Sequence, residues 1–130
     1  MFTEKKATEE RLLPFYNKLK NAWCKESCSP LLREKWQNGN VALGQCFVTA
    51  VAVRDTFGGD IFELHISEEI IHYYNIIDEE IVDLSSEQFK EHITSDFYRN
   101  GIPSDVSLLM KDPIKKKRYE ALICRMKDFN

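Results

Sequence analysis

The chain has no apolar run that approaches the length of a membrane span, and residues 1–11 are polar and charged, without the apolar core of a signal peptide. Neither a membrane segment nor a secretory leader is expected, and the expected location is the cytoplasm. The chain also lacks an excess of basic residues, since 18 Lys and Arg stand against 21 Asp and Glu, and no basic stripe is interleaved with aromatic residues. Nucleic acid is therefore not an expected partner.

Cysteine is scarce, with Cys24, Cys28, Cys46 and Cys124 the four copies. Nothing in the sequence points to secretion, and a chain of 130 residues buries a core without covalent staples, so free thiols are expected. Cys24 and Cys28 form a C-x3-C pair, but no second pair of His or Cys residues occurs at a similar spacing. A structural zinc site would lack half of its ligands, so neither a metal nor another cofactor is expected.

Hydrophobic residues make up 43% and charged residues 30% of the chain, a balance typical of a soluble globular protein and not of a disordered or fibrous one. The length suits a single domain covering residues 1–130, in which about residues 1–23 are a helical N-terminal extension. No pattern indicates assembly, so the oligomeric state stays open.

Three segments predict the principal helices. Residues 44–57 are apolar on most faces and are followed by Gly58 and Gly59, which indicates a buried central helix. A first helix is expected to begin near Pro14 and end near Trp23, with a charged helical extension before it. A last helix is expected to open at Asp112 and Pro113, with residues 115–118 pointing mostly to solvent.

Residues 60–66, 70–77 and 81–84 alternate between apolar and polar side chains and predict an antiparallel meander. Ser85, followed three residues later by Gln88, has the pattern of a capping box and predicts a short helix. The expected fold class is therefore α+β, with a central buried helix packed on a small antiparallel meander and flanked by other helices.

Cys46 falls in the first turn of the predicted central helix, directly after Gly44 and Gln45. A thiol becomes nucleophilic when a helix N-terminus or an imidazolium lowers its pKa, and the unpaired amides of a first turn can stabilise an oxyanion. His72 opens the second predicted strand and is the candidate base.

Asp83 is the candidate group for orienting the imidazole. If residues 78–79 form a two-residue hairpin loop, Tyr74 lies opposite Asp83, and Asp83 lies diagonal to His72 on the same face, about 7–8 Å away. One extra loop residue would instead pair Asn75 with Asp83 and turn the carboxylate away from His72.

Purely structural roles are open for the same residues. Cys46 lies in a strongly apolar helix, and free cysteine is among the most buried residue types, so an inert core thiol is equally consistent with the pattern. His72 and Tyr74 also suit half-buried, hydrogen-bonded strand positions, and Asp83 suits the cap of the helix that starts near Ser85.

The segments GQCFVTAVAVRDTFGGDI, HYYN and VDLSSEQF resemble the core pattern of the YunG-like family of small bacterial proteins, over roughly residues 23–126. The most specific matches are Gly44-Gln45-Cys46, Thr49, Phe57-Gly58-Gly59, His72-Tyr73-Tyr74-Asn75 and Asp83-Leu84. This resemblance implies no particular activity.

A looser resemblance concerns the order of a cysteine at a helix start, a histidine on a later strand and an aspartate on the next, which is similar to transglutaminase-like and other papain-like thiol enzymes. It implies a possible papain-like fold, with Cys46 as nucleophile, His72 as general base and Asp83 as the orienting residue. Those enzymes usually carry an oxyanion glutamine several residues before the cysteine, whereas Gln45 is its immediate neighbour.

Together these patterns favour a small thiol hydrolase or acyltransferase acting on a small molecule or a peptide. The expected substrate contacts are Trp36, Gln45, Tyr74 and Asn75. The rival hypothesis is a non-catalytic binding or accessory domain, in which the polar side chains near Cys46 and His72 form a buried network between helix and sheet. A third hypothesis is a redox sensor that pairs Cys46 with Cys24 or Cys28.

Overall fold

The computed structural model, which describes residues 1–128, is built around the helix α2 (Cys46–Phe57) and a five-stranded antiparallel sheet. The central strand of the sheet is β3, and its two neighbours, β2 and β4, belong to the same meander. In spatial order the strands are β1 (Phe2–Thr3), β4 (Glu80–Asp83), β3 (Ile71–Ile77), β2 (Asp60–His65) and β5 (Ile102–Pro103).

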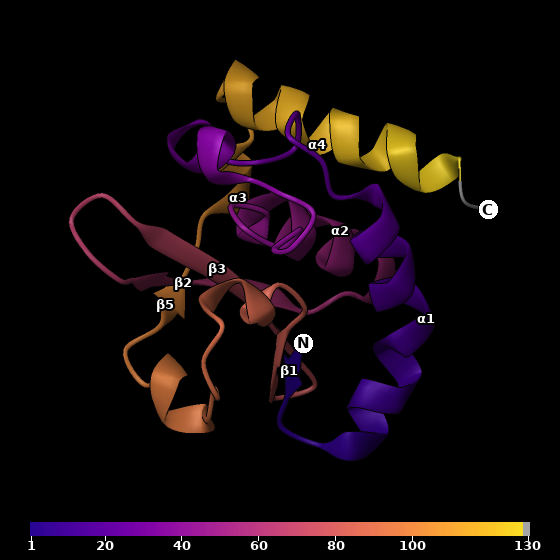
Figure 1. Cartoon of the computed structure of the whole chain (residues 1–130). Helices are drawn as coiled ribbons and strands as arrows, with labels where there is room; N and C mark the ends of the chain where they lie inside the picture. Colours follow the sequence, from indigo (N-terminus) through magenta and orange to yellow (C-terminus); the bar gives the residue numbers. More distant parts are fainter. Residues whose placement is uncertain (129–130) are drawn as a thin grey trace.

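Two long helices cover the side of α2 that does not face the sheet. They are α1 (Lys6–Ala22) and α4 (Pro113–Lys127), and Figure 1 shows α2 enclosed between them and the strands. All residues from 47 to 53 of α2 are buried, so the helix faces that the sequence predicted to be apolar contribute to the core of the protein. The expected α+β fold with a central buried helix is confirmed. The short helices are η1 (Pro30–Lys35), η2 (Ser86–Phe89), η3 (Ser95–Tyr98) and α3 (Val106–Leu109).

Helix α1 begins at Lys6, so the prediction that a first helix starts near Pro14 is wrong, and the expected extension is part of one continuous helix. Residues 6–13 are mostly good helix formers, and Leu12 is fully buried in the same core as Leu19. Burial of Leu12 favours a helix on both sides of the proline. Pro14 then removes one intrahelical hydrogen bond, to the carbonyl of Glu10, without ending the helix.

The β3–β4 hairpin has the register that a two-residue loop predicts. Asn75 pairs with Val82, and the pairing continues to Ile77 opposite Glu80. Asp78 and Glu79 both have positive φ, 50° and 68°, as the central residues of a type I′ turn do. The alternative register, with Asn75 opposite Asp83, is excluded.

The two faces of β3 have different surroundings. On one face, Tyr73 packs against Phe47 of α2 with ring centroids 5.2 Å apart, and the Asn75 amide donates to the Ala50 carbonyl at 2.9 Å. On the other face, Tyr74 packs against Tyr98, with centroids 4.7 Å apart, in a second, smaller core. The strand therefore joins the helical layer to the segment that follows β4.

The turn between α2 and β2 depends on Gly59, whose φ is +82° and whose Cβ, if present, would lie 2.5 Å from the carbonyl oxygen of Ile76. We expect Gly59→Ala to lower the free energy of unfolding by about 2–4 kcal/mol, because a left-handed backbone and a steric clash add together. Urea denaturation followed by circular dichroism measures the loss.

Gly58 provides the matched control, because its φ is +81° but a Cβ there would meet no atom within 4 Å. Gly58→Ala is expected to cost about 1–2 kcal/mol, from backbone strain alone. Equal losses for the two variants would contradict the packing of Gly59 against β3.

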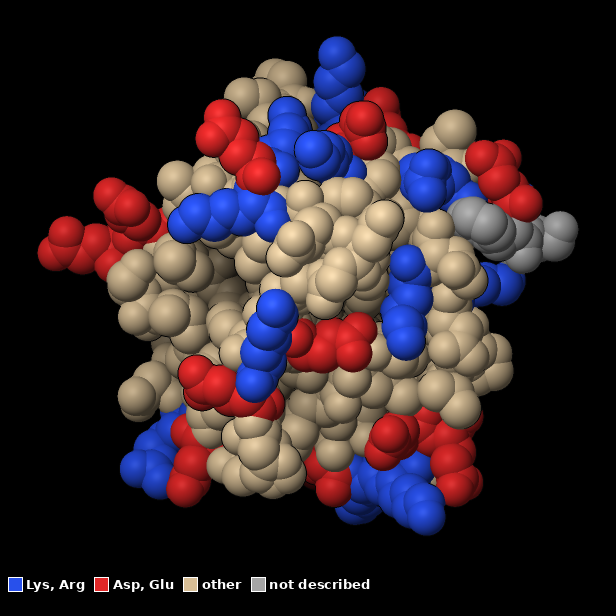
Figure 2. All heavy atoms as spheres, viewed as in Figure 1, with Lys and Arg blue, Asp and Glu red and all other residues tan. Residues whose placement is uncertain are grey.

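No helix within residues 1–128 is long and apolar enough to cross a membrane. On the face shown in Figure 2, basic and acidic side chains are interspersed, so neither sign of charge dominates it.

Candidate active site

Cys46 is the first residue of α2, and the loop before it is held tightly in place. Gly44 has a φ of +70°, and a Cβ on it would lie 2.5 Å from the Cys28 sulfur and 3.1 Å from the Ser29 amide nitrogen. Only glycine fits this close approach without displacing its neighbours. The Cys46 side chain is half-buried and lies in the wall of a pocket.

The Cys46 sulfur lies against an open edge of β3. The pairing of β3 with β4 ends at Asn75, so the edge beside residues 71–73 has no strand partner. There the thiol donates to the Ile71 carbonyl at 3.8 Å and accepts a hydrogen bond from the Tyr73 amide. The side chain thus supplies hydrogen bonds that a neighbouring strand would otherwise make.

His72 and Asp83 form a fully buried pair beside the thiol. His72 Nε2 lies 2.6 Å from Asp83 Oδ2, and each side chain is only 1% exposed. The same carboxylate oxygen accepts the Tyr98 hydroxyl at 2.7 Å, and Asp83 Oδ1 accepts the Ser85 amide at 3.3 Å. Asp83 therefore contacts the imidazole and also caps the turn that follows β4.

The pKa values of His72 and Cys46 are both shifted by their neighbours in this site. Burial alone lowers the pKa of His72, but the Asp83 charge and hydrogen bond outweigh burial and raise it to about 10. Burial alone raises the pKa of the Cys46 thiol, but a hydrogen bond from His72 and its positive charge bring that pKa below its ordinary value. Both shifts favour the thiolate–imidazolium form of the pair relative to the neutral thiol and imidazole.

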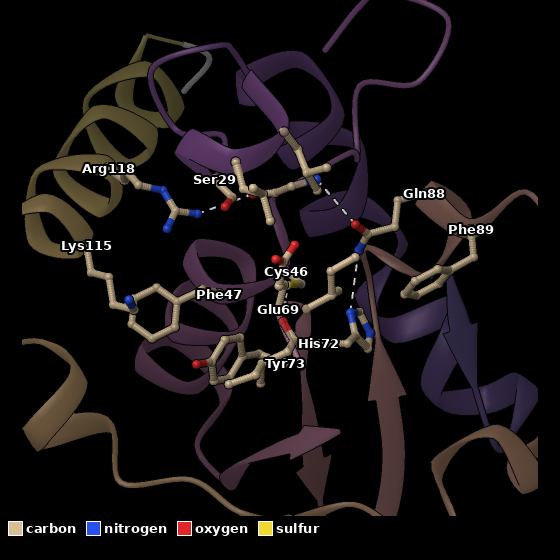
Figure 3. A pocket seen from close by; sticks show the side chains of 15 residues that line it. Ser29, Cys46, Phe47, Glu69, His72, Tyr73, Gln88, Phe89, Lys115 and Arg118 are labelled. Carbon is tan, nitrogen blue, oxygen red and sulfur yellow. Dashed lines mark hydrogen bonds between the residues drawn. The ribbon is translucent and has the colours of Figure 1, made fainter. Parts of the chain in front are cut away.

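Gln88 also belongs to this site, although the sequence pattern indicated a helix cap. The Ser85 side chain makes no capping hydrogen bond, so the predicted capping box is wrong. Gln88 instead accepts the Gly44 amide at 3.2 Å through Oε1, and its Nε2 lies 3.5 Å from His72 Nδ1. It connects the loop before Cys46 to the imidazole, as Figure 3 shows.

The pocket has a volume of about 170 Å³ and opens between η1, the start of β3 and α4. Figure 3 shows Cys46 in the middle of the lining residues, with His72 on one side and Phe47 and Tyr73 on the other. Basic side chains reach its wall from α4, at Lys115 and Arg118. Cys46 and His72 are both among the residues that line this pocket, although the His72 side chain is almost fully enclosed.

The four residues predicted to bind substrate do not line this pocket. Gln45 is fully buried, where it accepts the Ser27 hydroxyl at 2.6 Å and donates to the Cys24 carbonyl. The Trp36 indole donates to the Val41 carbonyl. Tyr74 and Asn75 are occupied in the two cores described above. The structure therefore does not place Trp36, Gln45, Tyr74 or Asn75 where a substrate held at Cys46 would lie.

The position of Arg118 also differs from the prediction, because residues 115–118 were expected to face mostly solvent. Its guanidinium is buried, and it donates to the carbonyls of Ser27 and Gly44 at 3.2 Å each. Helical periodicity alone gives no sign of these contacts, because both acceptors lie far away in the sequence.

A metal site is not apparent in the described part of the chain. Within residues 1–128, no group of three or more His, Cys, Asp or Glu side chains is arranged to hold a metal ion. Cys24 and Cys28 are both buried free thiols, and Cys28 donates to the Leu43 carbonyl at 3.2 Å.

Comparison with known proteins identifies the family. A family model described as "YunG protein" matches residues 11–129. "Uncharacterized protein YunG" of Bacillus subtilis (strain 168) is 40% identical over 75 residues, 58% of this chain and 60% of that protein, so the alignment spans less than two thirds of the relative. No solved structure matches significantly. The GQC and HYYN segments predicted this family. Because the family model covers most of the sequence, the chain belongs to the YunG family.

Proposed function

We propose that this protein is a small thiol hydrolase or acyltransferase of papain-like chemistry. The observation that carries the proposal is the chain of contacts from Cys46 through His72 to Asp83. The thiol lies at the start of a helix and in the wall of a pocket, and the imidazole that contacts it is hydrogen-bonded to a buried carboxylate. A thiolate–imidazolium pair with an orienting carboxylate is the arrangement that nucleophilic acyl transfer requires.

In the proposed reaction, the Cys46 thiolate attacks the carbonyl carbon of an amide or ester and forms a tetrahedral adduct. Amides in the first turn of α2, which have no acceptor within the helix, are suited to stabilise its oxyanion. The adduct collapses to a thioester as His72 gives its proton to the departing amine or alcohol. Water or a second nucleophile then gives a proton to His72, attacks the thioester and releases the acyl group, which restores the thiolate.

One observation favours the rival function of a non-catalytic binding domain. The Cys46 sulfur is hydrogen-bonded to the open edge of β3, a contact with a structural role of its own. In that case the pocket would bind a ligand without reacting with it, and the thiol would react slowly until the protein unfolds.

Alkylation by iodoacetamide, followed at each cysteine by peptide mapping, separates these functions. At pH 6.5 an ordinary thiol is roughly 1% thiolate, whereas the lowered pKa of Cys46 keeps a larger fraction ionised. We expect Cys46 to react about tenfold faster than the exposed Cys124 at this pH, with a rate that falls only as the pH drops through the lowered thiol pKa.

Two cysteines of the same chain serve as controls. Cys124 reports an exposed thiol, and Cys28, whose pKa is raised by burial, reports an enclosed one. If Cys46 labels as slowly as Cys28 throughout the folded range of pH, the enzymatic proposal is wrong and the binding domain is favoured.

A further inference from the structure

Arg118 is a buried cation without a carboxylate beside it in the described part of the chain. It is 6% exposed, and its Nε and Nη2 atoms donate to the carbonyls of Ser27 and Gly44. Among residues 1–128, no carboxylate forms an ion pair with it. Buried charges in proteins are normally paired with an opposite charge, so this guanidinium is available to an anion from outside.

One end of the guanidinium remains free to bind such an anion. Nη1 makes no hydrogen bond within residues 1–128, and this atom is not fully enclosed by the protein. It is therefore accessible, and Figure 3 shows the Arg118 guanidinium directed from α4 toward the pocket that contains Cys46. The unused N–H donors face the space next to the thiol.

The other charges around the pocket favour the same sign of ligand. Lys115 reaches the wall beside Arg118, although its Nζ also pairs with Asp112 at 3.4 Å. The one carboxylate in the lining is that of Glu69, an exposed residue of the β2–β3 loop. The rest of the wall offers apolar surface, mainly Leu32, Phe47, Ile70 and Tyr73.

We propose that Arg118 binds a carboxylate of the ligand, so that the pocket selects small amides or esters that carry a negatively charged carboxylate close to the reacting carbonyl. The acyl-transfer part of this statement rests on the function proposed above, whereas the recognition of a carboxylate does not. A guanidinium donates charge-assisted hydrogen bonds to a carboxylate, and the low exposure of Arg118 keeps water from competing.

The test compares pairs of alkylating agents that differ in a carboxylate. Iodoacetate is paired with iodoacetamide, and N-iodoacetylglycine with N-iodoacetylglycinamide, so the charge lies at two distances from the reacting carbon. For each pair, the ratio of acidic to neutral rate at Cys46 is divided by the same ratio at Cys124. We expect a normalised ratio of about ten or more for at least one pair, as for one charged hydrogen bond.

Variants assign the effect to Arg118. Arg118→Met is expected to bring the ratio to about one, and Arg118→Lys to retain part of it. Lys116→Met, an exposed lysine of the same helix outside the pocket, is the control and is expected to change the ratio less than twofold. A variant that lowers the reactivity of Cys46 equally toward the acidic and the neutral agent leaves the normalised ratio unchanged. If Arg118→Met does not fold, the wild-type ratio and Arg118→Lys still decide, and a wild-type ratio near one for both pairs overturns the proposal.

A second readout keeps the two proposals apart. If Cys46 reacts slowly with all four agents, the proposal of thiol catalysis is wrong. The binding of N-acetylglycine is then compared with the binding of its amide by NMR titration of the Cys46→Ser protein. Preferential binding of the acid supports carboxylate recognition alone if the preference is reduced when Arg118→Lys is added to Cys46→Ser and lost when Arg118→Met is added. Equal binding of acid and amide, or binding of neither, overturns it.

Discussion

Replacing Asp83 with alanine is expected to lower the free energy of unfolding by about 3–5 kcal/mol, because it leaves a buried imidazolium without its counter-ion. Asp83 and His72 are each 1% exposed, and the same carboxylate also accepts the Tyr98 hydroxyl and the Ser85 amide. Removing it leaves these donors, and the Ser85 hydroxyl, in the interior without this acceptor. Urea unfolding at pH 7, followed by fluorescence and circular dichroism, measures the change.

Asp96→Ala is the matched control, since its carboxylate forms an ion pair with Arg99 but is 81% exposed. That change is expected to alter stability by less than about 1 kcal/mol. Asp83→Asn keeps an acceptor for Tyr98 and is expected to fall between the two. Similar losses for Asp83→Ala and Asp96→Ala would show that the buried pair does not support the fold.

Replacing His72 with glutamine is expected to slow alkylation of Cys46 at pH 6.5 by about 30- to 100-fold. Without the imidazolium, burial is left as the main influence on the thiol, and burial raises its pKa. The thiolate fraction at pH 6.5 then drops below the roughly 1% of an ordinary thiol. The rate should then keep rising with pH beyond about 8.5, whereas the wild-type rate levels off at a lower pH.

His65→Gln controls for the loss of a histidine elsewhere, because the His65 ring contacts Glu63 and its side chain is 54% exposed. The Cys46 profile should not change in that variant. If His72→Gln and the wild type gave the same pH profile, the imidazole would have no influence on the thiol, and the proposed nucleophile would lose its basis.

The placement of His72 and Asp83 on one face of the sheet could be predicted from sequence because the hairpin geometry is local. The loop of residues 78–79 fixes the β3–β4 register, and period-2 alternation then puts Asp83 on the same face as His72. The apolar faces of residues 44–57 likewise predict a buried helix with Cys46 in its first turn, and α2 begins at Cys46 itself. The two-residue strands β1 and β5 are too short to show any alternation, and they were not foreseen.

The remaining walls of the site could not be predicted, because they depend on distant contacts. Gln88 fits a capping box within its own segment, and only the approach of Gly44 and His72 gives its amide other partners. Arg118 lies in a run of basic residues whose pattern suits solvent. Its acceptors, on Ser27 and Gly44, are known only once α4 is docked on the loop before α2.

The hairpin that carries His72 and Asp83 has a consequence for the order in which the site assembles. Their hydrogen bond closes a loop between residues 11 apart, whereas that from Arg118 to Ser27 joins residues 91 apart. The longer loop costs about 2 kcal/mol more in chain entropy. During folding, the imidazole and carboxylate can therefore meet before α4 docks, and the selectivity of the pocket is the last property that the folding chain acquires.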